Sequence, residues 1–585
     1  MSLMAGVIGR RPDAPRFQAV AQRLERAVSR NPGEPRSRLQ GPDFLIVKID
    51  FGFFGSSGLL DLPDRAAALC GEPLAGAGED RAGDLRAMTA ELVEGRTDLI
   101  SRARGTFALA CVHPVSRTLL LATDSMGARP LFAWVDDDLA VFASALRILE
   151  AIPEIPKLMD VRGVAEESAF GYSLGDRTPY LGIRYLRAGE LMRVTPEGST
   201  SVRYHRWDTI QSSIAPEPEL AGETYRRFAE AVRIRRKGGQ VQHAFLSGGL
   251  DSRCVVSELR HQGCRVSTYG YGLERSQELA FAEAFAAAAG TRHRRVAMPS
   301  GSWAYPELEP DDGPGGRGRM IWTGDGGSVA LGHVYLTRPM MELSRSGQLK
   351  EAAAAFRSEN QIGPGNRYLA STMPNSDRTI AEGMLEELAG YECDDPGRLL
   401  FFFLLENDQR RHLLPHFEDL DSHRQEFQVP FFDSEFLRVI VATPVDWCLG
   451  HGFYSQVLRF FPPVTVSVPW QTYPGHLPCP LPAPPGLGYQ WQPWRSNPRR
   501  LARRRALLEN TRQLLAQRPF PTAILNRTAI AAAYWLTRLR VRNYEYALAA
   551  ASVYERYWRV ASGAPTDRSA EGLPTGTPPP LNPKP

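Results

Sequence analysis

The sequence predicts an α/β protein whose first part is a layered, strand-rich domain and whose second part is a doubly wound parallel sheet. Over the first 210 residues, short apolar runs follow one another with few long helical patterns, which favours packed layers of sheet. From residue 221 onward, apolar runs alternate with helical patterns, which is typical of parallel strands covered by helices. The 43% apolar and 23% charged content is ordinary for a globular protein.

Charge and cysteine content exclude several classes of protein. The net charge of +4 gives no reason to expect binding to nucleic acid or to a membrane surface. The seven cysteines include no Cys-x-x-Cys pair, so we expect neither a disulfide framework nor a zinc site, which fits a cytoplasmic protein. No signal peptide is evident and no run of about 18 apolar residues occurs. The basic residues are almost all arginine, with no lysine between Lys350 and Lys584.

The strands of the first part are expected wherever apolar runs are bounded by glycine or polar turn residues. The expected strands cover residues 4–9, 44–54, 105–112, 118–123, 131–134 and 140–143. In the second part we expect a helix over 221–236, a strand over 244–246, a helix from 254, a strand over 265–270, a helix over 278–289 and a strand over 293–297. Residues 340–425 have mostly helical patterns.

The stretch that joins the strand at 244–246 to the following helix has the character of an anion site. Ser247, Gly248 and Gly249 form a tight turn in which glycines permit positive φ and close approach of backbone amides to a ligand. The free amides and the dipole at a helix start favour a phosphate. Asp251 would repel a phosphate unless a divalent cation lies between them. The turn lacks the lysine of the Walker-type loop.

Ser-Gly-Gly-Leu-Asp-Ser at 247–252 resembles the pyrophosphate loop of ATP pyrophosphatases, enzymes that split ATP between its α- and β-phosphates. The chain as a whole resembles the asparagine synthetase family. This resemblance implies an Ntn-type αββα domain followed by an ATP-pyrophosphatase-type parallel sheet with helical additions, and ATP and Mg²⁺ as cofactors. It rests on the segments Gly-Thr-Phe-Ala at 105–108, 124–131, Phe-Ala-Ser at 142–144, 171–175, Thr178 and Gly-Ile at 182–183, besides 247–252. The ATP-binding residues that it implies are Leu246, Ser247, Gly248, Gly249, Leu250, Asp251, Ser252 and Gly324.

The first domain departs from that family at its nucleophile. Family members begin Met-Cys-Gly-Ile, whereas Ala5 stands here at the cysteine position, and a methyl group cannot attack an amide. Cys70 stands where the family has the asparagine of its glutamine-binding Asn-Gly-Glu segment, and we interpret it as a small buried residue rather than a relocated nucleophile. We therefore expect a degenerate glutaminase domain that is kept for structure.

The second domain also departs from the family. In the second signature, at 320–332, Asp325 stands where the family has a glutamate, and Ser328 stands where it has a metal-binding aspartate. The resemblance implies Asp251 as a metal ligand, and Asp325 could supply the second carboxylate from a shifted position. Glu426 matches a family acid, although Gln428 replaces the family arginine. The loop at 467–478 lacks the lysine that in the family stabilises the acyl-adenylate, and His476 is its only ionisable base. The expected catalytic residues are Asp251, Asp325, Glu426 and His476.

These features favour an ATP-dependent ligase that adenylates a carboxylate and forms an amide without its own glutaminase activity. Lasso-peptide cyclases and β-lactam synthetases resemble this pattern, so a peptide macrocyclase is one possibility. The expected partners are a small-molecule or peptide carboxylate, a precursor peptide and a partner protease. Two alternatives stay open: a non-catalytic nucleotide-binding homologue, and ammonia-dependent synthesis of asparagine. The expected domains are 1–210, 221–480, a helical extension at 481–561 and a disordered tail at 562–585.

Overall fold

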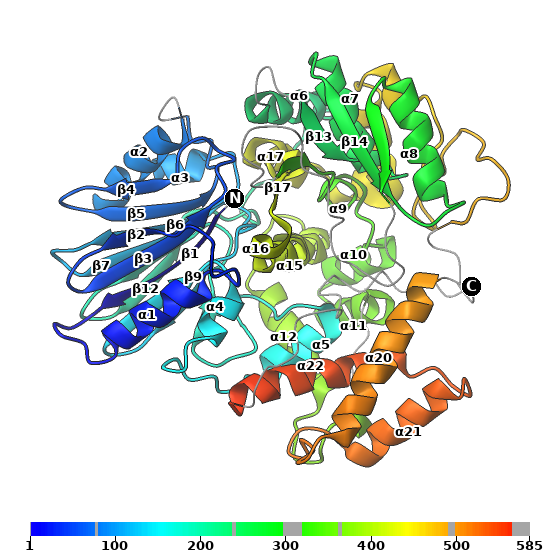
Figure 1. Ribbon diagram of the computed structural model, residues 1–585. Coiled ribbons are helices and arrows are strands. Elements are labelled where there is room, and N and C mark those ends of the chain that lie inside the picture. The colour runs from blue at the N-terminus through cyan, green and yellow to red at the C-terminus, as the bar shows by residue number, and fades with distance from the viewer. Residues whose placement is uncertain are drawn as a thin grey trace.

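A computed structural model describes residues 2–76, 80–236, 241–296, 319–360, 366–489 and 498–563. The layered sheets of the first part, the parallel sheet of the second part and a group of C-terminal helices occupy three regions of the molecule (Figure 1). The α/β class is as predicted. The predicted tail at 562–585 lies outside the described residues from 564 onward. None of the helices in the described ranges combines the length and apolar character that a membrane span needs.

Two six-stranded antiparallel sheets form the first domain, in the strand orders β10-β8-β9-β1-β3-β2 and β12-β11-β7-β6-β5-β4. The sheets face each other across a core that includes Met4, Ile46, Cys70 and Leu121. The strands are β1 (Ser2–Gly9), β2 (Ser37–Gln40), β3 (Phe44–Asp50), β4 (Leu59–Asp61), β5 (Ala66–Gly71), β6 (Phe107–His113), β7 (Thr118–Thr123), β8 (Phe132–Val135), β9 (Leu139–Ala143), β10 (Ile183–Tyr185), β11 (Glu190–Val194) and β12 (Ser199–Arg203).

Helices cover the outer faces of both sheets. Helices α1 (Phe17–Ala27) and α4 (Leu146–Glu150) pack on the sheet that contains β1, and α2 (Arg81–Val93) packs on the other, next to α3 (Asp98–Arg102). Alternation along β1 explains both cores, because Met4 and Ile8 point between the sheets while Leu3, Ala5 and Val7 point toward α1. The αββα layering expected of the first domain is therefore present.

The second domain is built on a five-stranded parallel sheet in the order β15-β14-β13-β16-β17. From β13 the chain first builds outward through β14 and β15, and then returns to the other side of β13 for β16 and β17. This reversal makes the carboxyl ends of β13 and β16 the topological switch point, where such sheets bind ligands. The strands are β13 (Gln242–Phe245), β14 (Val266–Tyr271), β15 (Arg292–Val296), β16 (Arg319–Trp322) and β17 (Gln425–Gln428).

Helices surround this sheet and continue beyond it. The α-helices are α5 (Val161–Phe170), α6 (Glu217–Arg235), α7 (Leu250–His261), α8 (Gln277–Ala288), α9 (Gly327–Gly332), α10 (Arg338–Arg345), α11 (Leu349–Asn360), α12 (Ser376–Ala389), α13 (Leu399–Phe403), α14 (Arg410–His412), α15 (Leu414–Glu418), α16 (Leu420–His423), α17 (Ser434–Ala442), α18 (Val445–Cys448) and α19 (Gly452–Leu458). The shorter turns are a π-helix (Leu404–Gln409) and the 3-10 helices Asn366–Tyr368, Pro396–Arg398, Pro430–Phe432, Leu449–His451 and Pro463–Val466.

Three C-terminal helices, α20 (Pro498–Ala516), α21 (Arg527–Arg538) and α22 (Glu545–Ala561), pack on one another at the edge of the molecule (Figure 1). Helix α22 also packs on α5 (Val161–Phe170), which lies between β9 and β10 of the first domain. Within the range 481–561, where a helical extension is predicted, these three helices begin at Pro498.

Buried ion pairs join the two domains. Arg129, which follows β7, pairs with Glu426 on β17, and their side chains are 3% and 0% exposed. Arg104 of the first domain pairs with Asp433 of the second, and within its own domain the Asp433 carboxylate also pairs with Arg235 on α6 and caps α17. Because an unpaired buried charge is costly, these pairs fix the domains against each other.

Candidate functional site

The turn after β13 is held by its own two serines. The Ser247 amide donates to the Ser252 hydroxyl at 3.0 Å, the two hydroxyls lie 3.0 Å apart, and the Gly249 amide donates to the Ser247 hydroxyl at 3.2 Å. Leu246 is buried and leads the chain from the sheet into this turn. Helix α7 starts at Leu250, so its first turn begins at the switch point of the sheet.

Neither glycine of the turn has positive φ, and Gly248 is needed for close approach, which corrects part of the sequence argument. Gly249 caps α7 with φ −87° and ψ −176°, and Gly248 is not among the positive-φ glycines. A Cβ on Gly248 would lie 2.8 Å from the Glu278 Cα, and one on Gly324 would lie 2.5 Å from the Ser252 amide nitrogen. The positive φ belongs to Gly326 (92°), which caps α9 in the second signature.

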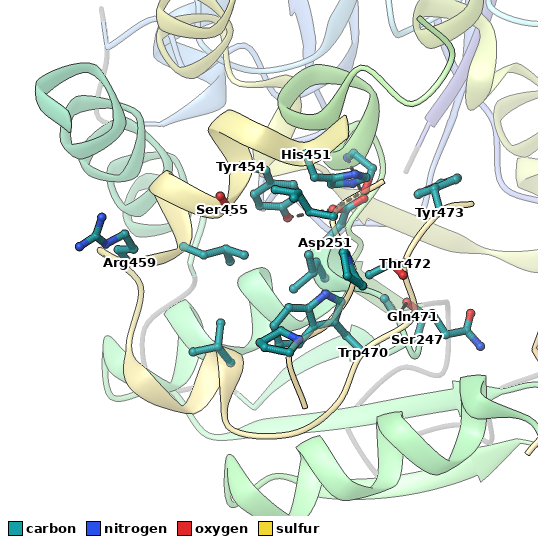
Figure 2. A pocket seen from close by; sticks show the side chains of 18 of the residues that line it. Ser247, Asp251, His451, Tyr454, Ser455, Arg459, Trp470, Gln471, Thr472 and Tyr473 are labelled. Carbon is teal, nitrogen blue, oxygen red and sulfur yellow. Dashed lines mark hydrogen bonds between the residues drawn. The ribbon is translucent and has the colours of Figure 1, made fainter. Parts of the chain in front are cut away.

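Asp251 lies in the first turn of α7 and accepts three hydrogen bonds. Tyr454 on α19 donates its hydroxyl at 2.8 Å, and Ser328 donates its hydroxyl at 2.9 Å and its amide at 2.8 Å. Figure 2 shows Tyr454 reaching the Asp251 carboxylate from above the turn. Burial nevertheless raises the pKa of Asp251 to about 6, because these donors only partly offset the loss of water.

Asp325 lies beside Asp251, and its charge adds to the upward shift of the Asp251 pKa. Its Oδ1 atom is 3.1 Å from Nε2 of His412. Burial would raise the pKa of Asp325, but the His412 contact holds that pKa below its usual value. The same contact raises the pKa of His412 against the effect of burial. The sequence argument missed His412, which follows the π-helix Leu404–Gln409 and matches no motif.

Carboxylates such as those of Asp251 and Asp325 are ligands that a magnesium ion arriving with a nucleotide accepts, although Asp325 is not among the described residues that line the cavity at this turn. Mg²⁺ commonly takes one or two protein carboxylates, and substrate phosphates and water complete its shell. Among the described residues, no group of three or more His, Cys, Asp or Glu side chains could hold a metal by itself. The donor set therefore suits a nucleotide-borne cation better than a cage made only of protein ligands.

A cavity of about 630 Å³ opens against this turn (Figure 2). Helix α19 and the segment 466–480 form much of its wall, and Arg459 is the one lysine or arginine among its described lining residues. The lining residues are Ser247, Gly249, Leu250, Asp251, Glu278, Ser328, His451, Tyr454, Ser455, Leu458, Arg459, Val466, Trp470, Gln471, Thr472, Tyr473, Leu477, Pro478 and Pro480. Its size is in the range of small-molecule sites.

His476 lies behind the cavity wall. Its Nδ1 atom is 2.7 Å from Nδ1 of His451, and His451 lines the cavity and stacks on Tyr454 with ring centroids 5.7 Å apart. Burial lowers the pKa of His476, and burial together with the neighbouring His476 lowers the pKa of His451 to about 3. Both rings are therefore neutral near pH 7 in this structure.

Glu426 does not line the cavity. It is completely buried on β17, where its Oε1 atom pairs with Arg129 and accepts from the Phe427 amide at 3.0 Å. Its place is therefore the domain interface.

In the first domain, apolar packing surrounds the position of the expected nucleophile. Ala5 is 0% exposed on the central strand β1, opposite Val47 on β3 and Ala143 on β9. Cys70 is 1% exposed on β5 and belongs to the core between the sheets. Nearby, the buried Lys48 and Arg81 side chains both pair with Asp50. Burial lowers the pKa of Lys48 to about 8.

Comparison with known proteins agrees with this architecture. Residues 82–205 match the family "Glutamine amidotransferase domain", and residues 223–304 match the family "Asparagine synthase". Carboxyethyl-arginine beta-lactam-synthase of Streptomyces clavuligerus is 27% identical over 376 residues, which cover 56% of this chain and 70% of that protein. Asparagine synthetase (glutamine-hydrolyzing) 3 of Bacillus subtilis is 25% identical over 182 residues, which cover 30% of this chain and 29% of that protein.

Among solved structures, glutamine phosphoribosylpyrophosphate amidotransferase from B. subtilis covers 53% of this chain and 69% of its own at 12% identity. The TM-score of this match is 0.24. The two domain matches, in this order along the chain, and the two synthetase relatives agree with the resemblance to the asparagine synthetase family.

Proposed function

We propose that the protein is an ATP-dependent, AMP-forming ligase that activates a carboxylate and joins it to an amine. The observation that supports this most is the position of the Ser247–Ser252 turn. It lies at the switch point of the parallel sheet, its helix start borders the cavity, and Asp251 lines that cavity. Amides at a helix start favour phosphate, and a carboxylate beside them suits a cation-bound phosphate.

In this scheme a carboxylate oxygen of the substrate attacks the α-phosphorus of ATP, the bond to the bridging oxygen breaks, and pyrophosphate leaves. The start of α7 and the Ser247 hydroxyl would bind the pyrophosphate, with Leu246, Gly248 and Gly324 shaping the turn. Asp251 and Asp325 would hold Mg²⁺, which when bound neutralises phosphate charge. An amine then attacks the acyl carbon, the bond to AMP breaks, and the amine loses a proton.

We propose further that the first domain does not hydrolyse glutamine. Ala5 offers no nucleophile, and Cys70 is enclosed between the two sheets. The amine would then come from ammonia or from the substrate itself. An intramolecular amine would make the enzyme a macrocyclase of a peptide, with a precursor peptide and a partner protease in the cytoplasm. Positions of two further residues fit indirect roles: Glu426 at the interface with Arg129, and His476 behind His451.

One observation favours the alternative of a nucleotide-binding protein without ligase activity. The wall segment 466–480 brings no lysine or arginine to the cavity, and His451 and His476 are neutral near pH 7. A transition state that gathers negative charge on the phosphate normally needs such a donor.

Exchange of labelled pyrophosphate into ATP separates the two functions. The purified protein is incubated with ATP, Mg²⁺ and labelled pyrophosphate, with and without pools of carboxylates that include aspartate and peptides. A ligase exchanges label only when its carboxylate is present, whereas a binding protein retains ATP without exchange. Exchange with aspartate alone would support ammonia-dependent asparagine synthesis. ATP binding without exchange in any pool would contradict the proposed ligase.

A further inference from the structure

Arg253 directly follows the Ser247–Ser252 motif, yet it is not among the described residues that line the cavity. Its side chain is 0% exposed, which is rare for an arginine. Helix α7 therefore carries a cavity-lining carboxylate at Asp251 and, two residues later, a fully buried cation. A buried cation needs compensation, so its partners indicate what it does.

Within the described part of the chain, the Arg253 guanidinium donates hydrogen bonds to backbone carbonyls only. Its Nε atom donates to the Gly249 carbonyl at 3.1 Å, at the start of its own helix. Its two terminal nitrogens donate to the carbonyls of Thr465 at 3.4 Å, Val468 at 2.9 Å and Pro469 at 3.0 Å. The guanidinium also lies over two rings, 5.0 Å from the Phe285 centroid and 5.8 Å from the Trp470 centroid.

Three of these carbonyls belong to one segment, 465–469, which runs directly into the cavity wall. Trp470, Gln471, Thr472 and Tyr473 follow it and all line the cavity (Figure 2). Two further bonds tie the same stretch to the turn and to α7, because the Gln471 amide donates to the Gly248 carbonyl at 2.9 Å and the Thr465 hydroxyl donates to the Ser257 hydroxyl at 2.8 Å. The wall and the phosphate-type turn are thus one connected unit.

The rigid, five-donor fork of arginine suits this task, because it can serve several carbonyls from one side chain. A lysine would offer a point charge and fewer fixed directions. In the described part of the chain, no carboxylate pairs with Arg253 among the ion pairs found. Its charge is therefore offset by carbonyl dipoles and rings alone, and an anion in the adjoining cavity would add to that compensation.

We propose that Arg253 is a positioning residue that fastens segment 465–471 to the turn after β13 and so fixes the cavity wall next to the nucleotide phosphates. The inference rests on the proposed function for the identity of the ligand, but the fastening itself does not. Without Arg253, three carbonyls and the Trp470 face lose their common partner, and the Thr465 hydroxyl and the Gln471 amide are left as the links of this segment to α7 and the turn.

The test uses the full chain with Arg253→Met, which removes the charge and the fork, and Arg253→Lys, which keeps only the charge. Arg398→Met is the matched control. Arg398 is 1% exposed, donates to the Val441 carbonyl at 2.6 Å and lies 4.9 Å from the Phe402 ring centroid. Unlike Arg253, it also pairs with Asp394, and it is not among the described lining residues. All variants are checked for folding by thermal melting.

The first measurement is hydrogen exchange of the peptides that cover 465–473, without any ligand. We expect faster exchange there in Arg253→Met, a smaller increase in Arg253→Lys, and no change there in Arg398→Met. The second is calorimetric titration with ATP and Mg²⁺, in which Arg253→Met should bind at least about tenfold more weakly, since it loses several hydrogen bonds to a charged group. Arg398→Met should bind like the wild type even where it melts earlier.

The outcomes separate this inference from the proposed function. Unchanged exchange over 465–473 in a folded Arg253→Met variant would overturn the fastening role, and equal affinity for ATP would overturn its effect on the site. If the wild type itself does not bind ATP while exchange still rises in Arg253→Met, the fastening stands and the proposed nucleotide function fails. If Arg253→Met does not fold, Arg253→Lys decides by the same two measurements.

Discussion

Strand β1 and the turn after β13 hold corresponding places in their domains but differ in their surroundings. Each lies at a central strand of its sheet, and each carries a motif of the family. Ala5 offers no nucleophilic atom, and its strand partners Val47 and Ala143 are apolar and buried. Around Asp251, polar groups meet a cavity. A similar central position is therefore filled by apolar packing in one domain and opens on a polar cavity in the other.

The free-energy cost of burying the side chain also differs between Ala5 and Asp251. Ala5 costs nothing to bury, whereas burial raises the pKa of Asp251 from 3.8 to about 6. A rise of this size corresponds to about 3 kcal/mol in favour of the protonated carboxyl. A side chain that costs this much in the folded state is easier to understand as part of a working site than as packing.

The largest effect is expected where the two domains meet. Arg129→Met would leave Glu426 buried without its cation and should cost about 3–5 kcal/mol of unfolding free energy. Denaturant unfolding measures it, and Arg129→Met combined with Glu426→Gln should regain part of the loss. The exposed pair Arg378–Glu382 supplies the control, since Arg378→Met should leave the unfolding midpoint unchanged. A loss no larger than that of this control would show that the first domain is not held by this pair.

The second-largest effect concerns the rate of pyrophosphate exchange, in which substitutions of Asp251 and Asp325 should differ. Asp251→Asn should lower the rate of pyrophosphate exchange by about 10²–10³, the usual cost of losing one preorganised group that handles transition-state charge. Asp325→Asn should cost less, because Asp325 is engaged by His412. Titration with ATP with and without Mg²⁺ gives the binding part of the loss. Equal losses in both variants would contradict this ranking.

The sequence was sufficient for the parts of the site that are local along the chain. It predicted the strand, the turn and the helix that carry Asp251, and the sheet that places them at a switch point. It could not predict that Tyr454 and His412 contact the two carboxylates, because these pairs are separated by 203 and 87 residues. Contacts at such separation leave no periodic pattern. The sequence also could not predict the roles of Gly248 and Gly324, because their close contacts are with residues of other elements, Glu278 and Ser252.

A smaller effect concerns pH. The folded-state pKa of Asp251 is raised, so its carboxyl is protonated below about pH 6, and Mg²⁺-dependent binding of ATP should weaken as the pH falls through 6. Because the folded state favours the protonated Asp251 carboxyl, the free energy of unfolding should fall as the pH rises from about 4 to 6. Tyr454→Phe removes one donor to the ionised form and should move the binding midpoint upward by about one pH unit. Calorimetric titrations between pH 5 and 8 measure the midpoint. A downward shift would mean that Tyr454 does not stabilise the charged carboxylate.

The smallest effect is expected in the first domain, where substitutions at Ala5 and Cys70 should not change glutaminase activity. The wild type should release no glutamate from glutamine, and Ala5→Ser and Cys70→Ala should leave that result unchanged. Ala5 points into the core under α1, so a hydroxyl there would be buried among apolar groups and not presented to a substrate. Cys70 points into the core between the sheets, beside the buried Lys48. A coupled glutamate assay on the three proteins decides the matter. Glutamate release that Cys70→Ala abolishes and Ala5→Ser preserves would make Cys70 the nucleophile, and the first domain would then be an active glutaminase with a relocated centre.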